Sequence, residues 1–159
     1  QRNNRNFRKM NKLLLISLVI FYTISSKSWA EDTLKPAVDI LQSDPSPTTF
    51  NYIMIRCGAL NNAMEIFLRD KGDPNSQEMI DTIESTKKNT IKYTQLAMQS
   101  SEHLNLGYTM DDIVILYDDI GLMYLKRWRK NYAGTGSYFG DLSLGDISLC
   151  SSVLKDIAK

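Results

Sequence analysis

The sequence predicts an all-α fold, a compact bundle of three long helices plus short terminal helices, cross-linked by one disulfide. Three segments, at about 49–70, 74–101 and 110–132, repeat apolar residues at the spacing of a helix. Proline- and glycine-containing connections separate them, and no run shows the convincing period-two alternation of a strand. Long helices with short connections are typical of a bundle.

The first long segment is predicted to be the central helix. It runs from about Thr49 to Asp70, after a proline-containing turn, and carries apolar side chains on most of its sides. A helix that is apolar almost all round is usually buried in the middle of its domain. We expect a short helix after Pro36 to precede it. The residues expected to form its remaining polar strip are Asn51, Gly58, Asn62, Glu65 and Arg69.

The second long helix is predicted to lie on the outside of the bundle. Asp73 is expected to cap it, with Pro74 as its first helical residue, and it should end near Ser101. Its apolar stripe, which includes Tyr93, is narrow and its opposite face is charged, as in a helix with one solvated side.

The third long helix, at about 110–132, begins with Thr109 and Asp112 at the spacing of a capping box. A last short helix is expected at about 146–157, after a glycine-rich loop. The predicted core face of the third helix consists of Ile113, Leu116, Tyr117, Ile120, Met123, Tyr124 and Trp128.

The N-terminal 30 residues have the three-part pattern of a secretory signal. An apolar run at 13–24 follows basic residues and precedes Ser28 and Ala30, the small residues that a signal peptidase requires. We expect cleavage after Ala30, with Met10 as the start and residues 1–9 as an upstream or non-native extension. The alternative is a retained membrane anchor, although the apolar run is shorter than a typical span.

Residues 31–159 are predicted to form a single helical domain that is mildly acidic. The leader contains six of the 19 basic residues and none of the 18 acidic ones, which leaves 13 basic and 18 acidic residues and a net charge of −5. Nucleic-acid binding favours a basic face, so we expect no nucleic-acid partner. Contact with the membrane is expected only transiently, through the signal peptide.

The two cysteines of the chain, Cys57 and Cys150, both lie in the expected mature domain. In an oxidising compartment, two cysteines in a secreted domain are most simply one disulfide. Such a bond would close a loop of about 90 residues and stabilise the fold by roughly 4 kcal/mol. Two free thiols with a redox role are the alternative, but no CxxC spacing supports it.

Arg56, beside Cys57 in the central helix, has two interpretations. If it is buried it needs a carboxylate partner, and the disulfide would bring Asp141 and Asp146 near it. This internal clamp on the C-terminal tail is the interpretation that we favour. The alternative is an anion-binding arginine in an open pocket.

The acidic pairs of the third helix are the strongest chemical signal in the sequence. Asp111, Asp112, Asp118 and Asp119 are spaced to share one helix face, where carboxylates could bind a hard cation such as Ca²⁺. We favour a solvated face, since basic residues in the last turns of the same helix complement its dipole. His103, the only histidine, lies in a polar stretch where a solvated side chain is expected.

Aromatic and basic residues are mixed in the segment that joins the end of the third helix to the glycine-rich loop. Trp128 and Tyr132 are expected in the core, because they fall on the buried side of the helix. Tyr138 and Phe139 lie in the loop and are the better candidates for contact with a partner, since loops commonly carry recognition residues.

The chain resembles a group of known proteins in a few short pieces, which are Arg56–Cys57, Asn131–Tyr132, Thr135–Gly136 and Cys150. It resembles uncharacterised small secreted helical proteins of marine bacteria and their phages, in which an Arg-Cys pair and a tail cysteine recur. The resemblance implies secretion and the disulfide, and it implies no activity.

Taken together, these patterns predict a periplasmic or extracellular helical domain that binds another protein or an envelope component without being an enzyme. No cofactor is expected. The alternative function is a carboxylate- or metal-dependent hydrolase that uses the Asp111–Asp119 face.

Overall fold

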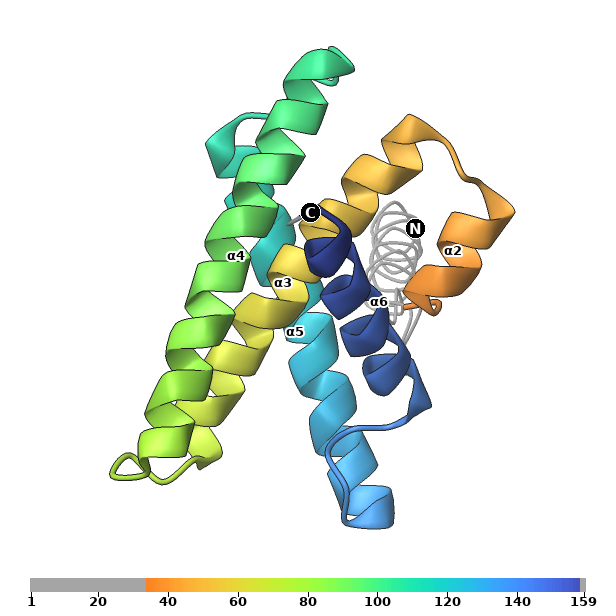
Figure 1. The fold of residues 1–159 in the computed structure, drawn as a ribbon. Helices are drawn as coiled ribbons and strands as arrows, with labels where there is room; N and C mark the ends of the chain where they lie inside the picture. The colour runs from red at the N-terminus through yellow and green to blue at the C-terminus, as the bar shows by residue number, and fades with distance from the viewer. Residues whose placement is uncertain (1–33, 158–159) are drawn as a thin grey trace, which may run out of the picture. The chain divides into compact units, whose positions relative to one another are not determined.

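The computed structural model describes residues 34–157, so the expected leader, its cleavage site and the extension at 1–9 lie outside the described residues. Residues Leu34–Lys159 group as one compact unit. The part described is all helical and contains no strand (Figure 1), which confirms the predicted fold class. The helices are α2 (Ala37–Ser43), α3 (Pro47–Lys71), α4 (Gln77–His103), α5 (Met110–Thr135) and α6 (Asp141–Ile157).

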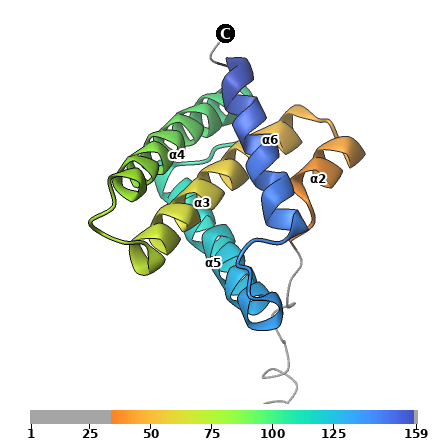
Figure 2. The same ribbon diagram turned by 60° about the horizontal axis from the view of Figure 1, so that its bottom comes forward.

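Helix α3 is the centre of the bundle, as its apolar surface predicts. It lies alongside α4, while α5 crosses it on another side, and α6 crosses it with α2 next to it (Figures 1 and 2). Eleven of its 25 residues are buried, more than in any other described helix. None of the helices in residues 34–157 combines the length and the hydropathy that crossing a bilayer requires.

Serine and threonine hydroxyls cap the three long helices. Ser46 accepts a hydrogen bond from the Thr49 amide and Pro47 occupies the first turn, so α3 begins two residues before its predicted start. The predicted cap of α4 was wrong: Asp73 accepts from the Asn75 amide in a turn, and Ser76 caps the helix instead. The capping box of Thr109 and Asp112 at α5 is confirmed.

The C-terminal helix starts earlier than the sequence pattern predicts. Helix α6 begins at Asp141 rather than at Asp146, and Gly145 lies inside it. Its first turns are held by Ser143, which is buried and accepts a hydrogen bond of 2.8 Å from the indole nitrogen of Trp128. A tertiary contact therefore overrides the low helix propensity of the glycine.

Two residues of the expected polar strip of α3 are in fact buried. The Asn51 side chain donates a 2.8 Å hydrogen bond to the Ala97 carbonyl oxygen of α4. At Gly58, a Cβ atom would lie only 2.0 Å from the Tyr117 hydroxyl oxygen of α5. Helices on both sides of α3 thus cover positions that the sequence assigned to solvent, and the glycine permits the close approach of Tyr117.

Two predicted core residues of α5 lie elsewhere. Met123 and Tyr132 are 44% and 49% exposed, so their assignment to the core was wrong. Gly121 is buried instead. A Cβ atom added to it would lie 3.6 Å from the Ala59 carbonyl oxygen of α3. The small residue lets the backbones of α3 and α5 come close. Met123, about 200° around the helix from Gly121, faces away from this contact. The predicted core residues Ile113, Tyr117, Ile120, Tyr124 and Trp128 are buried.

Candidate functional site

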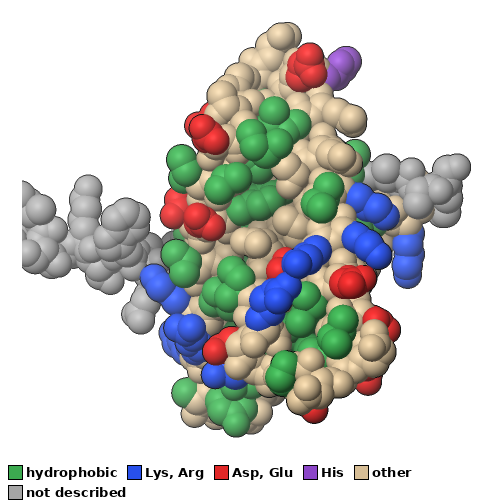
Figure 3. Space-filling model, turned by 90° about the vertical axis from the view of Figure 1, so that its left-hand side faces the viewer, with side chains coloured by type: hydrophobic (Ala, Val, Ile, Leu, Met, Phe, Trp, Pro, Cys, Tyr) green, Lys and Arg blue, Asp and Glu red, His purple; other side chains and the backbone are tan. Residues whose placement is uncertain are grey.

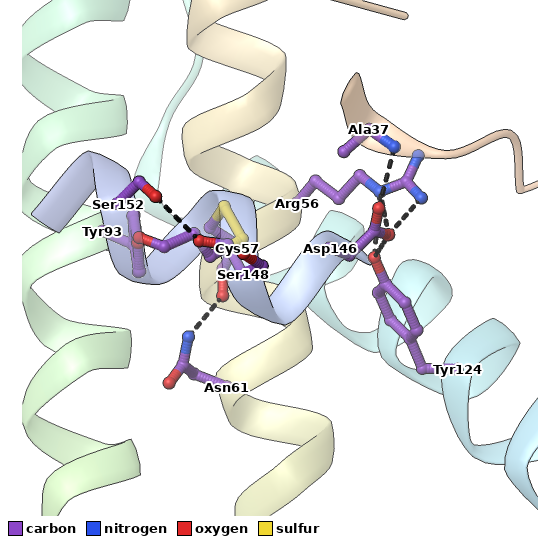
Figure 4. Close-up of a disulfide and its surroundings, with 10 residues drawn as sticks. Ala37, Arg56, Cys57, Asn61, Tyr93, Tyr124, Asp146, Ser148 and Ser152 are labelled. Carbon is purple, nitrogen blue, oxygen red and sulfur yellow. Dashed lines mark hydrogen bonds and ion pairs between the residues drawn. A yellow bond between two sulfur atoms is a disulfide. The ribbon is translucent and has the colours of Figure 1, made fainter. Parts of the chain in front are cut away.

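The disulfide between Cys57 and Cys150 joins α3 to α6 (Figure 4), as predicted. The two Cα atoms are 5.5 Å apart, within the ordinary range for a disulfide. Two hydrogen bonds hold the backbone on either side of the bond: Asn61 donates to the Cys57 carbonyl at 2.9 Å, and the Tyr93 hydroxyl donates to the Cys150 carbonyl. Helix α6 is therefore tied to both α3 and α4 at this level.

Next to the disulfide, Arg56 is completely buried and forms an ion pair with Asp146 of α6 (Figure 4). Its Nη2 and Nε atoms both donate to Oδ2 of Asp146, the latter at 3.1 Å. Nε also donates to the Tyr124 hydroxyl at 2.9 Å. Of the two partners proposed from the sequence, Asp146 is the one that the structure selects, whereas Asp141 is exposed.

The Asp146 carboxylate is satisfied on both oxygens. The Tyr124 hydroxyl donates to Oδ2, and the backbone N–H of Ala37 donates to Oδ1 at 2.8 Å. Ala37 is the first residue of α2, and the preceding Pro36 provides no side-chain cap. The carboxylate thus takes the place of the missing cap, where the helix dipole favours a negative charge. One side chain of α6 thereby connects α2, α3 and α5.

The surroundings of this cluster keep each group in one protonation state. Burial would lower the pKa of the Arg56 guanidinium, but the oxygens of Tyr124 and Asp146 outweigh burial, so the pKa lies above its ordinary value. Burial raises the pKa of the Tyr124 hydroxyl, which therefore stays neutral and donates to the carboxylate. Nη1 of Arg56 is buried and has no hydrogen-bond partner among the described residues.

These contacts correspond to the clamp interpretation of Arg56. An anion-binding arginine needs an open approach, but this side chain is 1% exposed and its charge is already paired. The cluster can hold four helices together, and none of its groups reaches solvent.

The loop candidates Tyr138 and Phe139 lie in an aromatic cluster between α5 and α6. Both rings pack edge-on against Phe67 of α3, at 4.7 and 5.7 Å between centroids, and Phe139 also contacts Trp128. Both are half-buried, while Tyr132 stacks on Tyr138 at 4.2 Å at the exposed edge. Their main contacts are within the fold, and a role in binding stays a prediction.

The four aspartates of α5 are all exposed. Asp112 is engaged in the capping box, where hydrogen bonds from the Thr109 side chain and backbone lower its pKa. Within residues 34–157, no group of three or more His, Cys, Asp or Glu side chains is arranged to hold a metal ion. His103 lies exposed at the end of α4.

A groove of about 320 Å³ lies where the loop joins α3 and α4. Its lining includes the apolar residues Leu68, Met79 and Ile83 and the basic residues Arg69 and Lys87. Both cations lie within 4 Å of the same carboxylate, that of Glu65, at 2.9 and 3.8 Å. The groove therefore has a mixed apolar and charged lining, and its two cations are already paired with a carboxylate.

Sequence reasoning missed the hydroxyl groups that complete the site. Tyr124 was expected in the core for its ring, and Tyr93 was assigned only to an apolar stripe, yet each hydroxyl makes a buried hydrogen bond to α6. The signal available was chemical, because a buried tyrosine hydroxyl usually finds a partner.

In comparisons with known proteins, no family model, no curated protein and no solved structure matches this chain, so its function has to be inferred from its own residues.

Proposed function

We propose that this chain is an exported, non-enzymatic helical domain, periplasmic or extracellular, that acts by binding another protein or an envelope component. Its disulfide supports export, because such bonds persist in oxidising compartments and are rare in the cytosol. The expected signal sequence at residues 10–30 points the same way.

The observation that carries the binding proposal is the exposed apolar surface of α5. Six of the thirteen large hydrophobic side chains that are exposed in the described residues belong to this one helix. Ile115 and Leu122 are 59% and 52% exposed. Exposed apolar side chains that lie on the same side of a helix and are bordered by charges, as Ile115 and Leu122 are, are typical of interaction sites. The six are Met110, Val114, Ile115, Leu122, Met123 and Tyr132.

The state of the polar candidates also supports binding over catalysis. Arg56 and Asp146 are buried and paired with each other, and Asp112 caps its own helix. A catalytic group has to reach a substrate with its hydrogen-bonding capacity free. The hydrolase alternative would depend on Asp111, Asp118 and Asp119, and within residues 34–157 no group of three or more His, Cys, Asp or Glu side chains is arranged to hold a metal ion.

A photo-crosslinking amino acid placed at Ile115 in cells that export the protein tests this proposal. The matched control carries the same amino acid at Ser152, an exposed position of α6. We expect light-dependent adducts of defined mass at position 115 and none above background at position 152. Equal yields at the two positions, or no adduct at either, would remove the support for a binding surface on α5.

The compartment is tested separately by the mass of the exported protein. Cleavage after Ala30 predicts a chain that begins at Glu31. A chain that retains the apolar run would support a membrane-tethered protein instead.

A further inference from the structure

One face of α5 carries acidic residues in its N-terminal half and basic residues in its C-terminal half, with the exposed Leu122 between them. Four of its residues follow one another at spacings of seven, four and seven, which places them on one line along the helix. They are Asp111, Asp118, Leu122 and Arg129. Lys126 lies one turn beyond Leu122 on the same side. We call this surface, formed by these five residues together with Val114 and Ile115, the α5 outer face. All seven are exposed.

Figure 3 shows the side of the molecule on which α4 lies, where hydrophobic side chains are exposed among acidic and basic ones. The side of α5 opposite its outer face packs on α3 through Tyr117, Gly121 and Tyr124. Among the described residues, none of the four charged side chains of the outer face forms an ion pair.

We propose that the α5 outer face binds the same face of a second copy of this chain, with the two helices antiparallel. The inference rests on the proposed function, in that it names the protein that occupies the binding surface. Most symmetric assemblies are two-fold dimers in which one patch meets itself, so the patch has to be self-complementary. An acidic half and a basic half on either side of an apolar centre satisfy that condition.

The spacing along the helix agrees with a two-fold axis near Leu122. At about 1.5 Å per residue, Asp118 and Lys126 each lie about 6 Å from that axis, on opposite sides. Antiparallel pairing therefore places Asp118 opposite the partner's Lys126. Along the helix, Asp111 lies about 16 Å from the axis and Arg129 about 10 Å from it on the other side. In the antiparallel pair, Asp111 therefore lies within about one helical turn of the partner's Arg129. Parallel pairing would instead oppose like charges, which fixes the orientation of the two helices.

Apolar contact at the axis is the second requirement of such an interface. Leu122 meets its own copy there. Val114 and Ile115, about 12 and 10 Å from the axis, lie at the level of the partner's Arg129 and contact the aliphatic part of its side chain. An apolar centre with a charged rim is the usual composition of a protein interface. A contact through one helix per chain is small, so we expect a reversible dimer at micromolar concentrations.

Sedimentation velocity of the mature chain, from about 1 to about 300 µM, tests the assembly. We expect a concentration-dependent monomer–dimer equilibrium that Leu122→Asp weakens about tenfold or more, because two carboxylates then face each other across the axis. The matched control is Ile91→Asp on α4, at a side chain that is 58% exposed, and it should leave the equilibrium unchanged. A chain that is monomeric over the whole range, or a dimer that Leu122→Asp leaves intact, overturns the proposal.

Charge reversal tests the antiparallel orientation. Asp118→Lys alone and Lys126→Asp alone should each weaken the dimer, since each places like charges opposite each other. An equimolar mixture of the two variants should dimerise as the parent does, because the mixed pair restores both contacts. The matched control pair, Glu84→Lys and Lys88→Glu on α4, should dimerise like the parent both separately and mixed. Failure of the Asp118/Lys126 mixture to recover the dimer overturns the antiparallel arrangement.

The cross-link at position 115 separates this inference from the proposed function. Adducts with twice the mass of the chain support the second copy. Adducts only with a different protein leave the binding function standing and overturn the dimer. The absence of any adduct, with a monomer in the ultracentrifuge, removes both.

Discussion

Arg56 and Cys57 are consecutive residues of α3, and each holds a residue of α6: Arg56 pairs with Asp146, and Cys57 is bonded to Cys150 one helical turn further on. A single covalent link would fix one point of α6 and leave the helix free to turn about it. The ion pair one turn away fixes a second point and so the direction of the helix. This arrangement accounts for an arginine inside an otherwise apolar segment.

Arg56→Met should lower the free energy of unfolding by about 3 to 5 kcal/mol. The substitution keeps most of the buried volume but leaves the Asp146 carboxylate without its cation, and removing one partner of a buried pair has this magnitude. Urea unfolding of both proteins, with the disulfide intact, measures the difference.

Arg69→Met is the matched control for that experiment. Arg69 also pairs with a carboxylate, that of Glu65, but its side chain is 51% exposed. Exposed pairs contribute about 1 kcal/mol or less, so this variant should be close to the parent in stability. An Arg56→Met loss no larger than that of the control would contradict the buried clamp.

Gly58→Ala should destabilise the fold by about 1 to 3 kcal/mol, although alanine favours a helix more than glycine does. The new methyl group would lie 2.0 Å from the Tyr117 hydroxyl oxygen, so α5 would have to move. Gly134→Ala, in α5 with no atom within 4 Å of the added Cβ, is the control and should be neutral or slightly stabilising. Equal effects at the two glycines in thermal unfolding would argue against the close packing of α3 and α5.

Stability should fall at alkaline pH as the buried tyrosines deprotonate. Burial raises the pKa of Tyr93, Tyr117 and Tyr124 above 10.0, the ordinary value at which they titrate in the unfolded chain. Above that pH the unfolded chain loses protons that the folded chain keeps, so the free energy of unfolding decreases as the pH rises. At pH of about 11 the loss is about 1.4 kcal/mol for each of Tyr93 and Tyr124, the two tyrosines whose pKa burial raises most.

Tyr124→Phe isolates one tyrosine in this pH series. The variant should be less stable at neutral pH, because Asp146 loses a hydrogen bond, and its stability should fall less steeply between pH of about 9 and 11. Parallel curves for parent and variant would show that Tyr124 titrates alike in the folded and unfolded chains, contrary to the burial described.

Addition of Ca²⁺ or Mn²⁺ should leave the melting temperature unchanged. The exposed aspartates of α5 form no convergent ligand set with other residues of the described chain, and Asp112 is engaged as a cap. At about 5 mM, above the dissociation constants of weak extracellular Ca²⁺ modules, binding to the folded state would raise the melting temperature. An increase that Asp118→Asn abolishes would revive the metal-dependent alternative.

The sequence was sufficient for the elements with strong local signals. The apolar surface of α3 predicted its central position, the capping box located the start of α5, and the pair of cysteines in a chain with a signal-like leader predicted the disulfide. Each of these depends on residues close together in the chain or on a choice between few partners.

Features that depend on three-dimensional contact were not predictable from the sequence. The burial of Asn51 and Gly58 depends on where α4 and α5 lie against α3, which periodicity within α3 does not specify. The exposure of Met123 depends on which side of α5 packs on α3, and Gly121, on the opposite side of the helix, occupies that contact. The bond between Asp146 and the Ala37 amide joins residues 109 positions apart, and no local pattern signals it.

The most direct test of this account is the state of the two cysteines in protein purified without reductant. Thiol labelling after denaturation, followed by mass spectrometry of the proteolytic fragments, should find no labelled thiol and one linked peptide pair that contains Cys57 and Cys150. Reduction should then lower the free energy of unfolding by about 4 to 5 kcal/mol, as expected for a bond across 93 residues. Two labelled thiols per chain in the unreduced protein would contradict the account.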